Sequence, residues 1–230
     1  MIDKMIHLED KKKALFRDRR DAGKKLVQRL IGYAGRQEVI VLALPRGGVP
    51  VAYEVAAALK VRMDIFIVRK LGWPGHEEMA IGAIASGGVR VLNEDIVRYL
   101  NIPDTLIDAV AQRELQELER REREYRGKRP PLELKDRTVI LIDDGLATGA
   151  SMRAAIVGVR AHAPARIVVA VPTAALETCK ALEPEVDQMI CASTPEPFYG
   201  VSRWYEDFSQ TTDEEVRLLL EEANRTLPNQ

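Results

Sequence analysis

The most constraining segment of this 230-residue chain is VILIDDGLATGASMRAA, at positions 139–155. An apolar run leads into two adjacent acids, Asp143 and Asp144, which are followed by a loop of small residues and a helix-like pattern. In open parallel sheets, ligands bind where strands end and the following helices begin. The segment therefore predicts an α/β fold with a ligand site directly after this strand.

Short apolar runs alternate with amphipathic stretches along the chain, which is the pattern of βαβ units in a mainly parallel sheet. Because the runs are short and rich in Val and Ile, we interpret them as buried strands. They lie at 38–44, 63–68, 80–85, 138–143, 166–172 and 186–192. Helices are expected at 49–59, 151–163 and 175–183, and near both ends of the chain. In the opening helix, the apolar face is predicted to hold Leu15, Ala22, Leu26 and Leu30.

Composition excludes several classes of protein. The chain has 34 Lys+Arg against 35 Asp+Glu, and this net charge of −1 gives no reason to expect nucleic-acid binding. The longest apolar run, residues 39–44, is too short to span a membrane, and the N-terminus lacks the apolar stretch of a secretory signal. Cys179 and Cys191 are too few for a disulfide framework or a metal knuckle. We expect a cytoplasmic protein.

Much of the charge lies in a predicted helix at about 104–126, whose apolar stripe fades beyond Leu118. The interleaved Glu and Arg residues that follow suit i,i+4 ion pairs. Because their signs cancel, a solvated helix is favoured over a nucleic-acid-binding arm. We interpret the helix as an insertion in a single domain that has its core at about 38–192 and a hood or tail at about 193–230.

The loop after the acid pair has the composition of a phosphate cradle. It consists of Ala147, Thr148, Gly149, Ala150 and Ser151. Small residues let backbone N–H groups approach a ligand, and the N-terminus of the next helix favours an anion. Bare carboxylates beside a phosphate would repel it, so Asp143 and Asp144 are expected to hold sugar hydroxyls, or a divalent cation through water.

A second strand–loop–helix segment is LALPRGGVPVAYEVAAAL, at positions 42–59. Gly47 and Gly48 permit a backbone conformation whose amides face a ligand, and Arg46 offers a fork-shaped donor for phosphate oxygens. Gly-Gly turns between a strand and a helix are common, so this segment is less specific than the first. It agrees with the first because it also predicts phosphate binding after a strand.

Together the two segments resemble the type I phosphoribosyltransferases. DDGLATGAS is similar to the loop with which that family binds 5-phosphoribosyl-1-pyrophosphate (PRPP), in its adenine phosphoribosyltransferase form. The resemblance covers residues 38–192 and implies a twisted, mainly parallel sheet flanked by helices, with a hood over the site. Two positions differ from relatives: hypoxanthine-guanine enzymes carry an Asp at Ala147, and a branched apolar residue is usual at Gly145.

The resemblance also implies roles for individual residues. Asp143 and Asp144 would hold the ribose hydroxyls and, indirectly, Mg²⁺, while the loop at 147–151 would bind the 5-phosphate. The diphosphate would lie on the loop of Arg46, Gly47 and Gly48.

The segment 69–88 supplies further candidates. Arg69 and Lys70 follow a predicted strand and could reach the diphosphate, or could be an ordinary basic strand end. The Gly and Pro residues after them suit a mobile cover, which the family uses to exclude water. Within it, Glu77 and Glu78 are candidates for the general acid/base, with solvated loop charges as the alternative.

An aromatic segment at 193–210 is expected to contribute to the hood over the base. Phe198 and Trp204 are the candidate stackers for a nucleobase. The alternative is that these aromatics pin the C-terminal segment onto the sheet.

The resemblance implies transfer of the 5-phosphoribosyl group from Mg²⁺–PRPP to a nitrogen nucleophile, with a nucleobase as the expected acceptor and diphosphate released. One alternative is a non-catalytic regulator that binds PRPP or a nucleotide, and another is hydrolysis of a phosphoribosyl compound. Members of the family are commonly homodimers, but the sequence identifies no interface.

Overall fold

The computed structural model describes residues 14–225, apart from the side chains of Glu77 and Glu78. The elements in chain order are α1 (Arg19–Leu30), η1 (Ile31–Tyr33), β1 (Val39–Ala43), α2 (Gly48–Leu59), β2 (Arg62–Ile65), β3 (Val68–Trp73), β4 (His76–Ala85), β5 (Val89–Leu92), α3 (Glu94–Tyr99), α4 (Asp104–Arg126), β6 (Thr138–Ile142), α5 (Ala150–Arg160), β7 (Arg166–Thr173), α6 (Leu176–Leu182), η2 (Glu183–Glu185), β8 (Gln188–Ser193), η3 (Val201–Trp204) and α7 (Asp213–Arg225).

A five-stranded parallel sheet forms the centre of the molecule, which confirms the predicted α/β class. Its strand order is β2-β1-β6-β7-β8, and every neighbouring pair is parallel. All residues of β1 and β6 are buried, because helices cover both faces of the sheet.

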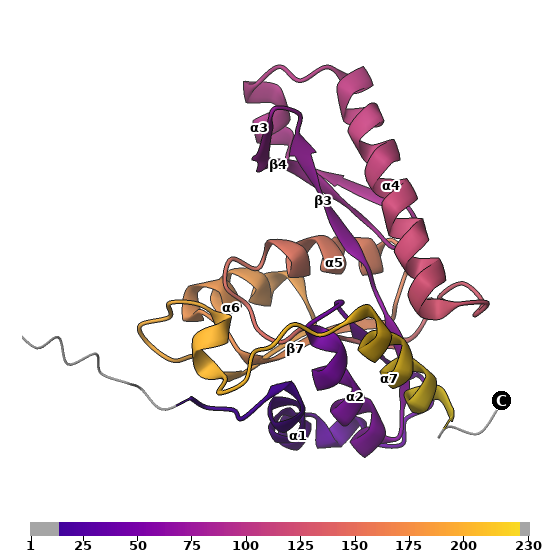
Figure 1. Ribbon diagram of the computed structural model, residues 1–230, viewed down its shortest axis with the longest axis vertical. Coiled ribbons are helices and arrows are strands. Elements are labelled where there is room, and N and C mark those ends of the chain that lie inside the picture. Colours follow the sequence, from indigo (N-terminus) through magenta and orange to yellow (C-terminus); the bar gives the residue numbers. More distant parts are fainter. Residues whose placement is uncertain (1–13, 226–230) are drawn as a thin grey trace, which may run out of the picture.

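Successive residues of each strand face opposite sides of the sheet and so contribute to two separate cores. In β6, Ile140 and Ile142 belong to a core shared with α1, α2 and α7. Their neighbours Val139 and Leu141 pack with residues of α5 and α6 on the other face. Figure 1 shows α1, α2 and α7 together on one side of the sheet and α5 and α6 on the other.

The strand order places a topological switch point between β1 and β6. From β1 the chain passes through α2 to β2 on one side, and it later returns to β6 on the other side of β1. The loops that follow β1 and β6 therefore leave adjacent strands at the same edge, in opposite directions. A crevice of this kind is where open α/β sheets bind their ligands.

The predicted strand at 80–85 is correct as a strand, but it does not join the parallel sheet. It forms part of β4 in a separate three-stranded antiparallel sheet of order β3-β4-β5. The segment 69–88, interpreted above as a cover loop, is largely the β3–β4 hairpin, with Gly75 at its turn at φ +82°. The apolar pattern marks which residues are buried but does not encode the direction of pairing, and that is the reason for the error.

The charged helix α4 has the predicted bounds. It lies along the antiparallel sheet in Figure 1 and ends near α7. Its buried face holds Ile107, Val110 and Leu118, as expected, but it continues beyond the predicted stripe to Tyr125. Several i,i+3 and i,i+4 ion pairs, among them Arg120–Glu124 at 2.9 Å, confirm the predicted pairing.

Two further expectations are corrected. Leu15 precedes α1 instead of lying on its face, because Asp18 caps the helix by accepting a hydrogen bond from the N–H of Asp21. Cys179 and Cys191 form a disulfide between α6 and β8, although two cysteines were too few to predict one. The fold brings these elements together across twelve positions of sequence. In the part of the chain that is described, no helix has the length and apolarity needed to cross a bilayer.

Candidate functional site

The acid pair lies at the carboxyl end of β6 and is partly buried. Oδ1 of Asp143 accepts a hydrogen bond of 2.8 Å from the backbone N–H of Asp144. Oδ2 of Asp144 accepts one of 2.8 Å from Nε of Arg19, which belongs to α1. The Tyr205 hydroxyl donates to the carbonyl of Asp144 at 2.6 Å. Protein groups thus orient both acids before any ligand binds.

Burial raises the pKa of both carboxyl groups. For Asp143 the pKa lies well above its usual range because burial and the neighbouring Asp144 both disfavour the charged form. Burial also raises the pKa of Asp144, against the opposing effect of the Arg19 guanidinium. A ligand that offers hydroxyls or a cation to this pair would relieve the cost of holding two negative charges there.

The loop after β1 lies directly against the acid pair. A Cβ atom on Gly47 would come within 2.1 Å of Oδ2 of Asp144, and one on Gly48 within 2.7 Å of the carbonyl oxygen of Ile142. No larger residue fits at either position, so the two glycines are required for the contact between the loops. The Pro45–Arg46 peptide bond in this loop is cis.

The phosphate cradle predicted at 147–151 forms a loop that ends in the first turn of α5. Ala147, Thr148, Ala150 and Ser151 are exposed, whereas Gly149 is buried at φ +73°. Gly149 is also the N-cap of α5, and no side chain caps this helix. The first N–H groups of α5 are therefore available to an anion.

Gly145, which departs from the usual pattern of the resembling family, has a packing reason. A Cβ atom there would lie 2.6 Å from Cγ1 of Val201 and 3.0 Å from the carbonyl oxygen of Thr173. The C-terminal segment therefore occupies the space that a branched side chain would need.

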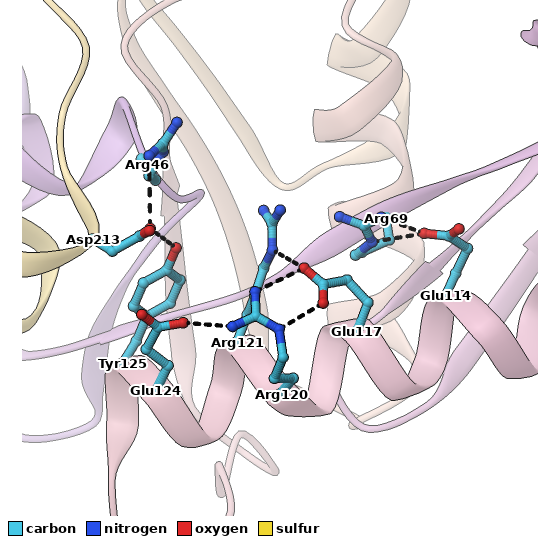
Figure 2. Close-up of polar contacts among 9 residues, drawn as sticks. All are labelled: Arg46, Arg69, Glu114, Glu117, Arg120, Arg121, Glu124, Tyr125 and Asp213. Carbon is cyan, nitrogen blue, oxygen red and sulfur yellow. Dashed lines mark hydrogen bonds and ion pairs between the residues drawn. The ribbon is translucent and has the colours of Figure 1, made fainter.

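The basic candidates lie on two elements, the loop after β1 and strand β3 of the antiparallel sheet. Arg46 forms an ion pair with Asp213, with NH1 and Oδ1 separated by 3.7 Å. Arg69 donates to Oε2 of Glu114 on α4, from Nε at 2.8 Å and from NH2 at 2.5 Å. Lys70 is exposed on β3. Two of the three cations are thus held by acids from outside the predicted site (Figure 2).

The aromatic segment packs on the N-terminal segment and also contacts the residues that follow β6. Trp204 is only 2% exposed and packs with Phe16 and Tyr205. Phe198 is less buried and stacks against Trp204, with ring centroids 6.4 Å apart. Trp204 therefore has a packing role here, and Phe198 is the candidate whose ring is accessible.

An open pocket of about 530 Å³ adjoins the phosphate cradle. It is lined by Ala175, Leu176, Glu177, Glu196, Pro197 and Phe198. The backbone N–H of Ala175 donates to Leu146 at 3.0 Å, and the Thr178 hydroxyl donates to Ala147 at 2.5 Å. These bonds hold the pocket against the loop that carries the cradle.

The side chains of two candidates for the general acid/base, Glu77 and Glu78, lie outside the described part of the structure. Their suggested acid/base role stays a prediction. Among the described side chains, no group of three or more His, Cys, Asp and Glu is placed to hold a metal ion. The two carboxylates of the acid pair offer hard oxygens, which suit Mg²⁺ that keeps most of its water.

Sequence reasoning missed Arg19 and Tyr205. The pair of Arg19 and Asp144 spans 125 positions, and no local pattern announces it. Arg19 is further fixed by the Phe208 ring, 3.8 Å from its guanidinium carbon, and by the carbonyl of Ser209, to which NH1 donates at 2.6 Å. The excess of aromatics at 193–210 was the available signal, but it was interpreted as a base-binding feature.

Comparison with known proteins identifies one protein family over most of the chain. The family model of the phosphoribosyl transferase domain matches residues 13–196. Two curated proteins of Mycobacterium tuberculosis are 44% identical over 211 residues, which is 92% of this chain and 47% of each of them. One is named "Putative phosphoribosyl transferase Rv0571c". The chain thus spans about half the length of the curated relatives it matches.

Solved structures of other proteins have a similar fold. The crystal structure of TT1426 from Thermus thermophilus has a TM-score of 0.79 at 42% identity, covering 90% of this chain and 98% of that one. A hypothetical protein from Neisseria gonorrhoeae with bound ppGpp has a TM-score of 0.50 at 14% identity, covering 91% of this chain and 96% of that one. The latter likeness concerns the fold alone.

Proposed function

Because the chain belongs to the phosphoribosyl transferase domain family, we propose that it transfers the 5-phosphoribosyl group of Mg²⁺–PRPP to a nitrogen nucleophile and releases diphosphate. The observation that carries this proposal is the contact between the two loops at the switch point, where Gly47 lies against the carboxylate of Asp144. This contact brings a phosphate cradle, an acid pair and a second glycine loop together at one edge of the sheet.

The geometry supports binding of the three parts of PRPP by three different sets of residues. Its 5-phosphate would lie on the exposed residues of 147–151, at the uncapped N-terminus of α5. Asp143 and Asp144 would accept hydrogen bonds from the ribose hydroxyls. The diphosphate would lie on the loop of residues 45–48, next to the acid pair.

Magnesium would arrive with the substrate, where it neutralises charge on the diphosphate. Asp143 and Asp144 are the residues that would contact it, through water. Their contribution is to orient the ribose and to place negative charge close to the reacting carbon, C1.

In the transfer step, the bond between C1 and the diphosphate oxygen breaks, and that oxygen keeps the electron pair. The nitrogen nucleophile then supplies the pair for the new bond to C1 and loses its proton, for which Glu77 or Glu78 is the proposed acceptor. Positive charge that develops on the ribose ring lies near the acid pair, which stabilises it. The protein mainly positions the reactants and excludes water.

The acceptor would enter through the pocket that adjoins the cradle. Phe198 offers a flat apolar ring there, which suits a nucleobase. Glu177 and Glu196 line the same pocket, and carboxylates accept hydrogen bonds from amino groups or ring N–H groups. A base with such donors is therefore the preferred acceptor class.

The test is incubation with Mg²⁺–PRPP and a panel of bases, following diphosphate and new nucleotide. Base-dependent release of diphosphate would support the transferase. Stabilisation of the protein by PRPP without turnover of any base would indicate a binding regulator instead. Diphosphate release that needs no base would indicate hydrolysis.

The variant Asp144→Asn tests the assigned loop. It removes the charge but keeps an acceptor oxygen for Arg19, so PRPP affinity is expected to fall about 10- to 100-fold, the value of one or two hydrogen bonds to a charged group. Calorimetric titration with Mg²⁺–PRPP measures this loss. Glu119→Gln on α4 is the matched control and should leave the affinity unchanged. Equal affinity of Asp144→Asn and the wild type would contradict the assignment.

A further inference from the structure

The motifs that support the proposed function leave α4 without a role. Its charged half nevertheless reaches the side of the molecule where the basic candidates lie. Figure 2 shows Arg46 and Arg69 on the same side of α4, toward opposite ends of its charged stretch. Both are held through α4: Arg69 directly by Glu114, and Arg46 by Asp213, which accepts a hydrogen bond from the Tyr125 hydroxyl.

Arg121 lies between these two arginines. Its Nε donates to Oε1 of Glu117 at 2.8 Å. In Figure 2 the tip of its guanidinium points away from α4, toward the side on which Arg46 and Arg69 lie. The bond to Glu117 engages Nε, so the two terminal nitrogens are oriented outward as a fork of the kind that binds phosphate oxygens.

Tyr125 lies near two of these cations, Arg121 and Arg46. Burial and its bond to Asp213 raise the pKa of the Tyr125 hydroxyl to about 12, and Arg121 and Arg46 both act in the opposite direction. Both guanidinium groups therefore lie close enough to influence the same buried hydroxyl. Since Tyr125 is 5% exposed, this hydroxyl is a fixed point between the two.

Glu117 holds Arg121 in place over a wide range of pH. Hydrogen bonds from Arg120 and Arg121 lower the pKa of this carboxyl to about 2. It therefore stays charged wherever the protein is folded under ordinary conditions. Arg120 also donates from NH1 to Oε2 of Glu124 at 2.9 Å. Glu117 and Glu124 thus form one ion-pair network with Arg120 and Arg121.

We propose that Arg121, oriented by Glu117, binds the diphosphate group of the substrate together with Arg46 and Arg69. This inference rests on the proposed function, since it needs PRPP as the ligand. It assigns the inserted helix α4 a direct part in the site: α4 supplies one cation for the leaving group and holds the other two. When the bond to C1 breaks, the diphosphate gains negative charge, and arginines placed there stabilise it.

The test compares Arg121→Gln with Arg123→Gln as the matched control. Arg123 lies on the same helix, is 69% exposed and pairs only weakly with Glu119, at 3.7 Å. Binding of Mg²⁺–PRPP, inorganic diphosphate with Mg²⁺, and ribose 5-phosphate is titrated calorimetrically against each protein. Ribose 5-phosphate lacks the diphosphate and so reports on the phosphate cradle alone.

Arg121→Gln is expected to weaken PRPP and diphosphate binding about tenfold or more and to leave ribose 5-phosphate binding unchanged. Arg123→Gln should leave all three unchanged. Arg121→Lys keeps the charge but loses the fork, so it should recover only part of the lost affinity. Equal PRPP affinity of Arg121→Gln and the wild type would overturn the inference while leaving the proposed function intact. Failure of the wild type to bind PRPP would overturn both.

Glu117 is a positioning residue in this scheme, and a double-mutant cycle tests it. Glu117→Gln should weaken PRPP binding by less than Arg121→Gln, because the arginine remains but is less well oriented. Combined with Arg121→Gln it should add nothing further. Additive losses would show that Glu117 does not act through Arg121.

Discussion

Carboxyl groups in two regions of this molecule shift their pKa values in opposite directions. At the end of β6, burial raises the pKa of Asp143 and Asp144, and one arginine, Arg19, opposes it. On α4, Glu117 is 29% exposed and two arginines lower its pKa to about 2. The same chemical group is costly to ionise in one place and easily ionised in the other. The difference shows that burial and partners, and not the number of charges, decide what a charged residue can do.

The buried region should be sensitive to loss of its single cation. Arg19→Gln leaves the carboxylate of Asp144 without its partner, in an ion pair whose side chains are 11% and 15% exposed. We expect a loss of about 3 kcal/mol of folding free energy, as for other buried pairs broken on one side. Urea denaturation at pH 7 measures it.

The control is Arg17→Gln, because Arg17 is 70% exposed in its pair with Asp18 and solvent screens such a pair, so the loss of folding free energy should be far smaller. Without Arg19 the pKa of Asp144 rises further, so the folded state of the variant binds a proton more tightly. Its loss of stability should therefore be smaller at pH 5 than at pH 8. A loss equal to that of Arg17→Gln would contradict the comparison.

Disrupting the contact between the loops that follow β1 and β6 should give the second largest loss of folding free energy. Gly47→Ala places a Cβ atom 2.1 Å from Oδ2 of Asp144. The loops must separate, at a cost of about 2 kcal/mol, typical of overpacking a tight contact. Gly32→Ala is the matched control, since a Cβ atom there meets nothing within 4 Å. Thermal unfolding of both variants tests the prediction, and equal melting temperatures would mean that the loops do not depend on this contact.

Removing a charge from the acid pair should stabilise the ligand-free protein. The folded-state pKa of Asp143 lies above its ordinary value of 3.8, so the folded state holds this proton more tightly than the unfolded state does. The stability that comes from this proton is therefore lost as the pH rises above about 4. Asp143→Asn removes this dependence and should be more stable than the wild type at pH 8.

This gain should disappear near pH 4, where both proteins are neutral at this position. Denaturation of both proteins from pH 4 to pH 8 measures the trend. A gain that did not depend on pH would show that packing, and not ionisation, is responsible. Under the proposed function the stabilised variant should also bind PRPP more weakly, because it lacks a carboxylate that would hold the ribose hydroxyls.

Loss of an exposed ion pair on α4 should give the smallest loss of folding free energy. Arg120 is 55% exposed and pairs with Glu117 and Glu124, so Arg120→Gln should cost far less folding free energy than Arg19→Gln, because solvent screens exposed pairs. Denaturation at low and high salt measures it, and the loss should shrink in 1 M salt because the pairs are screened. A loss comparable to that of Arg19→Gln would remove the distinction between the two regions.

The local elements of the site were predictable because each is written in a short stretch of chain. The strand before Asp143, the small-residue loop at 147–151 that leads into α5, and the glycines at 47 and 48 between β1 and α2 all lie where their patterns indicated. The bounds of α4 were also predictable, because the helical pattern is continuous and Gly127, at φ +59°, ends it. In each case the deciding interactions join residues that are close in sequence.

The features that the sequence did not predict depend on contacts between segments that are distant in the chain. The antiparallel sheet of β3, β4 and β5 was missed because alternation of apolar residues does not specify which strand a partner is or in which direction it runs. The sequence leaves Trp204 open between stacking on a base and packing within the protein, and the structure packs it on Phe16, whose position no nearby residue reveals. The disulfide between Cys179 and Cys191 needed α6 and β8 to be neighbours.

The sequence alone thus determined the class of fold, the two loops and the family that they resemble, because these depend on local backbone preference and on the order of strands and helices. Only the tertiary structure decided which charges are buried and what each one contacts. It paired Arg19 with Asp144 across 125 positions and turned Arg121 toward the side on which Arg46 and Arg69 lie. Burial and Coulomb interactions depend on distance in space, and only the folded chain sets those distances.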